Sequence, residues 1–138
     1  MATVQFPSDK RRQSVDVSAN KTLTAADQGI VQNVVADGIV ITLPSTAAGL
    51  SFTVRNGGVK VTNGAAGTGA NGTVLVAVSP AAADAIAGNG FTAAVNKDAL
   101  NTKATSTVGD EITVVGSGTT GVTAWSIAEL VGTWAREA

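Results

Sequence analysis

The segment from Val31 to Asn63 constrains the fold more than any other part of the sequence. It reads VQNVVA-DG-IVITLP-STAAG-LSFTVR-NGG-VKVTN, so short apolar runs are separated by turn residues. Asp37-Gly38 and Asn56-Gly57 are strong hairpin signals, because a two-residue turn needs positive φ at its central positions. We therefore predict four short strands in a row, paired as an antiparallel meander.

The side chains of these strands alternate between two faces. Ile39, Ile41 and Leu43 point one way, and Val40 and Thr42 point the other way. The next strand repeats the pattern with a second apolar set, which consists of Leu50, Phe52 and Val54. A period of two predicts a sheet with one dry face and one wetter face. The face with Val40 becomes dry as well if subunits assemble on it.

The length and composition of the chain indicate one folded domain. The chain has 138 residues, of which 44% are hydrophobic and only 4% are aromatic. Such a chain buries enough surface to form a real core and is not disordered. We expect small β-branched side chains to pack around the aromatic residues Phe52, Phe91, Trp125 and Trp134.

Further strands follow at a spacing of about ten residues. Segments 73–79 and 111–115 have strand character, and the chain closes either as two strands or as one strand broken at Glu129. Thr24 is expected to cap one helical turn, and Ser79 to Asp84 reads as a cap, a proline and further helical turns. This spacing predicts an all-β fold with short helical turns: an antiparallel sandwich, a jelly roll or a small barrel. We assign residues 21–138 to this domain.

Residues 1–20 form an N-terminal arm of different composition. They contain Pro7 and the basic cluster Lys10-Arg11-Arg12. Val15 and Val17 alternate with polar residues, which allows one short strand. The arm is either a solvated tail or a segment that docks on another subunit or on a partner surface.

Catalytic chemistry has few candidate residues in this sequence. Histidine, cysteine and tyrosine are all missing, which removes the common triads and the imidazole and thiolate metal sites. Asp110 and Glu111 are adjacent, and neighbours on a strand face opposite sides, so they do not form a catalytic pair. We expect no enzyme activity, no cofactor and no bound metal.

Two features that suggest nucleotides or nucleic acids have plainer explanations. The segment from Gly67 to Gly72 matches the pattern G-x-G-x-x-G, but a strand-like segment follows it where a phosphate site needs a helix. The net charge is −1, and the basic cluster has only Phe6 as an aromatic neighbour. We expect no nucleic-acid partner. No apolar stretch approaches 18 residues, so we also expect no membrane partner.

Trp125 and Trp134 leave two interpretations open. Both have strand-like surroundings, which favours packing in the core or at a subunit interface. The alternative is an exposed platform on which a sugar stacks.

An ordered series of motifs resembles a known group of proteins. LTAADQG, VVADGIVITLPSTAAGLSFTV, VSPAAADAIAG, STVGDEITVVGSG and VGTWA follow one another across residues 22–135. In this order they resemble small virion proteins of tailed bacteriophages, namely capsid decoration (cement) proteins and related head-surface proteins. The resemblance implies a β-sandwich or jelly-roll subunit that assembles as a homo-oligomer, typically a trimer.

The resemblance also implies a function and a place in the virion. It leads us to expect a structural protein that binds the outer surface of the capsid lattice and stabilises it, with the major capsid protein as partner. The protein would be made in the cytoplasm of the bacterial host and end on the virion. The residues predicted to contact the capsid lie in the arm and are Phe6, Lys10, Arg11 and Arg12. The alternative is a receptor- or glycan-binding module of a phage head fibre or tail.

Overall fold

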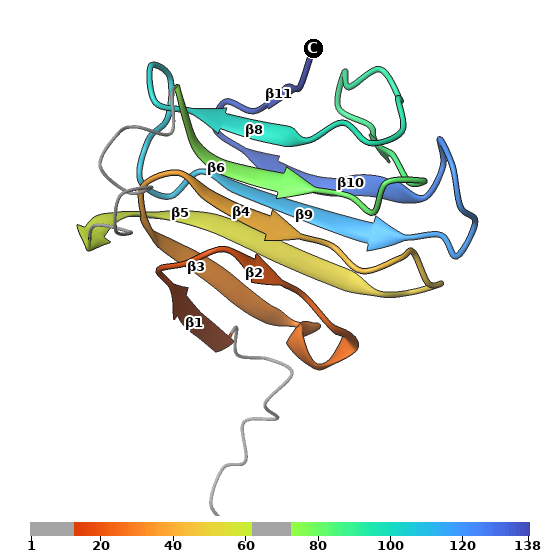
Figure 1. Cartoon of the computed structure of the whole chain (residues 1–138), viewed down its shortest axis with the longest axis horizontal. Coiled ribbons are helices and arrows are strands. Elements are labelled where there is room, and N and C mark those ends of the chain that lie inside the picture. Colours follow the sequence, from red (N-terminus) through yellow and green to blue (C-terminus); the bar gives the residue numbers. More distant parts are fainter. Residues whose placement is uncertain (1–12, 62–72) are drawn as a thin grey trace, which may run out of the picture.

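The computed structural model describes residues 13–61 and 73–138, and these residues form two β-sheets packed face to face (Figure 1). The strands of sheet A, in spatial order, are β1 (Gln13–Val17), β3 (Ile30–Ala36), β5 (Ser51–Val61), β9 (Glu111–Gly116), β10 (Trp125–Val131) and β7 (Ile86–Ala87). Those of sheet B are β11 (Ala135–Arg136), β8 (Ala99–Thr102), β6 (Val74–Ser79), β4 (Ile39–Thr42) and β2 (Lys21–Thr22). The expected all-β sandwich is confirmed.

The first six strands do not form an antiparallel meander but wind alternately through the two sheets. From β1 to β6 the chain alternates between the sheets, so that β1, β3 and β5 are parallel in sheet A and β2, β4 and β6 are parallel in sheet B. The second half adds antiparallel partners, with β9 beside β5, β10 beside β9 and β8 beside β6. Both sheets are therefore mixed, and the antiparallel pairing that we expected for the first half is wrong.

The Asp37-Gly38 turn shows why the hairpin prediction failed. Gly38 has the expected positive φ of 72°, but the turn carries the chain from β3 in sheet A to β4 in sheet B. The Gly38 amide donates to the carbonyl of Leu75, at the edge of β6, over 3.0 Å. A dipeptide determines only the local turn, and the sheet that the next strand joins depends on distant partners.

The Asn56-Gly57 signal marks an irregularity inside one strand. β5 runs without interruption from Ser51 to Val61, and its register against β3 shifts between Val34 and Ala36. The Asn56 side chain accepts a hydrogen bond from the amide of Gly58, which has a φ of 81°. The two strands predicted on either side of this site are therefore one bulged strand.

The helical turns expected after β6 are also absent from the described residues. Ala25–Asp27 forms a 3₁₀ turn with Thr24 as its N-cap, as expected, but the segment from Ser79 to Asp84 contains no helix. The buried carboxylate of Asp84 accepts from the Thr46 amide at 2.9 Å, and its carbonyl accepts from Asn96. These contacts hold the segment as a loop. At the end of the chain β10 is one strand with a register shift between Ile127 and Glu129.

The core lies between the two sheets and contains both tryptophans. The rings of Phe52 and Trp125 are 5.7 Å apart and tilted by 49°, and Phe91 packs at the margin of the core. Trp125 is 0% exposed and Trp134 is 7% exposed, so the core interpretation is confirmed and an exposed sugar platform on these rings is wrong. The apolar set Ile39, Ile41 and Leu43 is buried, as the alternation predicted.

Candidate binding groove

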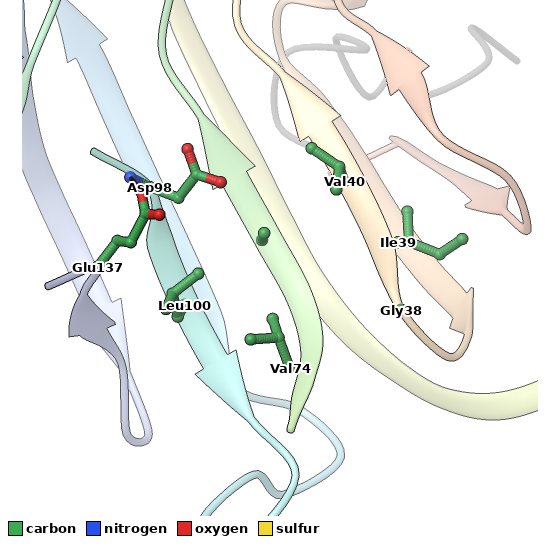
Figure 2. Close-up of a pocket in the computed structure, with 8 residues that line it drawn as sticks. Gly38, Ile39, Val40, Val74, Asp98, Leu100 and Glu137 are labelled. Carbon is green, nitrogen blue, oxygen red and sulfur yellow. Dashed lines mark hydrogen bonds between the residues drawn. The ribbon is translucent and has the colours of Figure 1, made fainter. Parts of the chain in front are cut away.

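An apolar groove runs over the outer face of sheet B (Figure 2). Val40, Ala77 and Leu100 are direct neighbours in the register of β4, β6 and β8. The groove has a volume of about 330 Å³ and is lined by Gly38, Ile39, Val40, Val74, Ala77, Asp98, Leu100 and Glu137. We call it the sheet-B groove.

The strand pattern explains why this surface is apolar and hollow. Val40 points outward because Ile39 and Ile41 on either side of it are buried in the core. Ala77 lies between Val40 and Leu100, and its short side chain leaves a depression between the two larger ones. A register shift between Val74 and Val76 interrupts the alternation of β6, so Val74 lines the groove whereas Val76 and Val78 are buried in the core. Such a depression has the apolar lining that an apolar side chain needs for burial.

Two carboxylates lie together at one end of the groove. The Asp98 amide donates to Oε2 of Glu137 over 3.2 Å, and the Glu137 amide donates to the carbonyl of Asp98 over 2.8 Å. Figure 2 shows the two side chains beside each other, across the groove from Val40. An approaching cation would be attracted to this end.

The pKa of the Asp98 carboxyl is shifted by its surroundings in the groove. Burial is the main cause that raises the pKa of the Asp98 carboxyl above its ordinary value. A hydrogen bond with Ser79 opposes the shift, the charge of Glu137 adds to it, and Lys97 opposes it. The Lys97 ammonium itself donates to the carbonyl of Ala138 at 2.6 Å. A further positive group near Asp98 would favour the charged form of this carboxyl.

The outer face of sheet A has a different character. Its hollow is lined by Ser14, Val31, Arg55 and Glu111, and Arg55 lies directly opposite Glu111 in the register of β5 and β9. Both acids are buried, but Glu111 lines this hollow while Asp110 accepts from the Asn101 side chain, so the two acids diverge as predicted. This face is polar, and we do not regard it as the principal binding surface.

A buried polar junction connects the two sheets at one end of the sandwich. Asn56 on β5 donates to Asn101 on β8 at 3.1 Å, and Asn101 donates to Oδ2 of Asp110 at 2.8 Å and to the carbonyl of Thr133 at 3.0 Å. The Thr107 amide also donates to Asp110. We call Asn56, Asn101 and Asp110 the polar junction. Its groups satisfy one another inside the chain, which indicates a structural role.

The sequence contained little signal for these sites. Asp98 and Glu137 are 39 positions apart in the chain and belong to no recognisable motif. Asn101 lies in a segment, ALNT, that has only weak strand character. By contrast, the outward direction of Val40 followed from the alternation.

The residues predicted to contact the capsid are not placed by the structure. Phe6, Lys10, Arg11 and Arg12 lie outside the described residues, as does the glycine-rich segment 67–72. The segment after these glycines is the strand β6, as expected, and not a helix. Within residues 13–61 and 73–138, no group of three or more acidic, histidine or cysteine side chains is gathered for a metal ion.

The chain was also compared with known proteins. Neither a protein-family model nor a curated protein sequence matches it. In the part of the chain that the structure describes, no helix has the length and the apolar character needed to cross a membrane.

Proposed function

We propose that this protein is a structural virion protein that decorates and stabilises the capsid of a tailed bacteriophage. The observation that carries the proposal is the ordered series of five motifs across residues 22–135, which resembles capsid decoration proteins. The major capsid protein would be the partner, and the outer surface of the assembled lattice would be the site of binding.

The architecture supports a role in binding rather than in chemistry. The described surface offers an apolar groove and a polar face, and the buried polar groups of the junction hold the sheets together. A rigid subunit of this kind loses little conformational freedom when it binds. A protein that binds only the assembled lattice shifts the equilibrium away from disassembly. Contacts repeated over the lattice add avidity.

The edges of the sheets support assembly into an oligomer. β2, β7 and β11 are edge strands of two residues each, whereas the edge strand β1 has five residues and its Val15 is 40% exposed. Long edge strands are normally covered, because their free backbone groups pair with other chains. A symmetric homo-oligomer, for which we propose a trimer, is one way to cover such an edge.

The capsid contact predicted for the arm stays a prediction, because Phe6 and Lys10 to Arg12 lie outside the described residues. Phe6 and the cluster from Lys10 to Arg12 would contact the capsid protein. Deletion of residues 1–12 should then lower capsid occupancy, and unchanged occupancy would remove the arm from the interface.

The alternative function, a receptor- or glycan-binding module of a phage head fibre or tail, loses one supporting feature. Its motivating feature was an aromatic platform, and both tryptophans are buried.

Purified protein mixed with capsids that lack it provides the test. We expect the protein to sediment with the capsids and to raise the temperature at which they disassemble. Failure to bind intact capsids, with the protein itself folded by circular dichroism, would contradict the proposal.

A further inference from the structure

We propose that residues 1–12 of one copy bind in the sheet-B groove of a second copy. This inference rests on the homo-oligomer in the proposed function, and it gives residues 1–12 of the arm a binding site on the neighbouring subunit in place of the capsid contact predicted above. It is a heterologous contact, which closes into a ring when the rotation between the copies permits it.

Charge complementarity is the first reason. The segment MATVQFPSDKRR carries the three basic residues Lys10, Arg11 and Arg12 and a single acid, Asp9. The groove ends in the carboxylates of Asp98 and Glu137, which lie together. Two cations are near them in the chain: Lys97 precedes Asp98, and Arg136 precedes Glu137. Arginine binds carboxylates through two parallel hydrogen bonds, so a pair of acids at a groove end suits it well.

The spacing of apolar and basic groups also matches. Val40 and Asp98 are separated by two strand spacings and by one two-residue step, which together give about 12 Å. Phe6 precedes Lys10 by four residues, or about 13 Å when the chain is extended. Pro7 favours an extended conformation at Phe6. With Phe6 over Val40 and Leu100, the basic cluster therefore reaches the acidic end.

The reach of the chain indicates that the arm comes from a second copy. Three residues of chain separate Lys10 from Gln13, where β1 begins in sheet A, and three residues span about 10 Å at most. Asp98 belongs to sheet B and lies about three strand spacings, or about 14 Å, from the edge strand β2. The separation of the sheets adds about 10 Å in the perpendicular direction. The straight distance from β1 to Asp98 is therefore about 17 Å, and this line runs through the core. The path around the edge of the sandwich is longer, so the basic cluster of the same chain does not reach Asp98.

The molar mass of the protein in solution, measured by light scattering, tests the inference without any capsid. We expect the full chain to be an oligomer and the variant lacking residues 1–12 to be a monomer. Leu100→Arg should also be monomeric, because it places a positive charge in the groove. Val108→Arg is the matched control, since Val108 is 64% exposed and lies outside the groove; it should remain an oligomer.

A synthetic peptide of residues 1–12 gives a second test that does not depend on the folding of any groove variant. The peptide should bind the protein that lacks residues 1–12, at least tenfold more weakly at 0.5 M salt than at 0.05 M. It should bind at least tenfold more weakly to Leu100→Arg than to Val108→Arg in the same deletion background.

The outcomes separate this inference from the proposed function. If deletion of residues 1–12 leaves the molar mass unchanged, the inference is overturned. If the deletion leaves the mass unchanged and abolishes capsid binding, the arm contacts only the capsid, and the proposed function stands. If the full chain binds no capsid but the oligomer depends on the arm and on Leu100, the inference stands and the proposed function fails.

Discussion

The polar junction and the sheet-B groove use polar residues in opposite ways. In the junction, Asn56, Asn101 and Asp110 are buried and find their partners within the chain. In the groove, Asp98 and Glu137 are partly exposed and lie beside apolar residues, with Lys97 as the neighbouring cation. We therefore assign stability to the junction and the proposed binding to the groove, which are separate parts of the molecule. Changes at the junction should affect folding, and changes at the groove should affect assembly.

The largest effect is expected from Asn101→Leu. The substitution keeps the volume but leaves the Asp110 carboxylate and the Asn56 amide without their partner in the interior. We expect the free energy of unfolding to fall by about 3–5 kcal/mol, as when one member of a buried charged network is removed. Urea denaturation measures this change. Val122→Ala, at an exposed position, is the control and should stay within about 0.5 kcal/mol of the unmodified protein. A loss below about 1 kcal/mol for Asn101→Leu would show that the junction is not important for stability.

Gly57→Ala should have a smaller effect on stability. A Cβ atom at this position would lie 2.5 Å from Oδ1 of Asn33, so the Asn33 amide, which donates to Asp16 at 2.9 Å, would have to move. We expect a loss of about 1–3 kcal/mol, the usual result of overpacking. Denaturation of the single and double variants measures the coupling between the two positions. Asn33→Ala in the same chain should recover part of the loss. Additive losses in the double variant would argue against the close contact between Gly57 on β5 and Asn33 on β3.

Leu100→Arg should separate the two regions most clearly. Leu100 is partly exposed on the outer face of β8, and the arginine stem can cover the same surface. We expect the free energy of unfolding of the variant lacking residues 1–12 to change by about 1 kcal/mol or less on this substitution, while peptide binding is lost. Chemical denaturation and peptide titration on one sample measure both quantities. A large loss of stability would mean that the groove belongs to the structural core.

The smallest effect concerns pH. Because the pKa of Asp98 is raised in the folded state, the folded protein binds more protons than the unfolded protein above pH 3.8, the ordinary value. The contribution of Asp98 to stability therefore decreases as the pH rises from about 3.8 through its folded pKa. Asp98→Asn should remove this decrease and gain up to about 1 kcal/mol relative to the unmodified protein at neutral pH.

The pKa of Asp27 is shifted in the opposite direction to that of Asp98. Although burial acts to raise its pKa, hydrogen bonds with Thr24 and the charge of Lys21 outweigh burial and lower the pKa. Its contribution is present above about pH 3.8 and is lost as the pH falls through the lowered pKa. Denaturation between pH 3 and pH 7 should show opposite slopes for Asp98→Asn and Asp27→Asn when each is compared with the unmodified protein. Equal slopes would contradict the assignment.

Local patterns in the sequence predicted the parts of the fold that local physics determines. Alternation placed Ile39, Ile41 and Leu43 in the core and Val40 outside, and the strand-like surroundings of Trp125 favoured packing in the core or at a subunit interface over an exposed platform. The pairing of strands was not predictable in this way. The turn at Asp37-Gly38 is compatible with both a hairpin and a crossing between sheets. The parallel pairing depends instead on contacts between β1, β3 and β5 and between β2, β4 and β6.

The candidate site was even less visible in the sequence. The acidic end of the groove exists because β11 pairs with β8 and brings Glu137 to Asp98. Similarly, the burial of Asn101 depends on Asp110 and Thr133, which come from two different loops. Such contacts depend on long-range pairing, for which a single sequence offers no periodic signal.

The number of copies bound to each capsid tests the central claim most directly. Capsids lacking the protein would be saturated with it, and the bound protein and the capsid protein would be quantified in the same sample. If the protein decorates the lattice, we expect a constant whole-number ratio of bound copies to capsomers. A ratio of only a few copies per virion would contradict lattice decoration and would indicate a fibre or tail component.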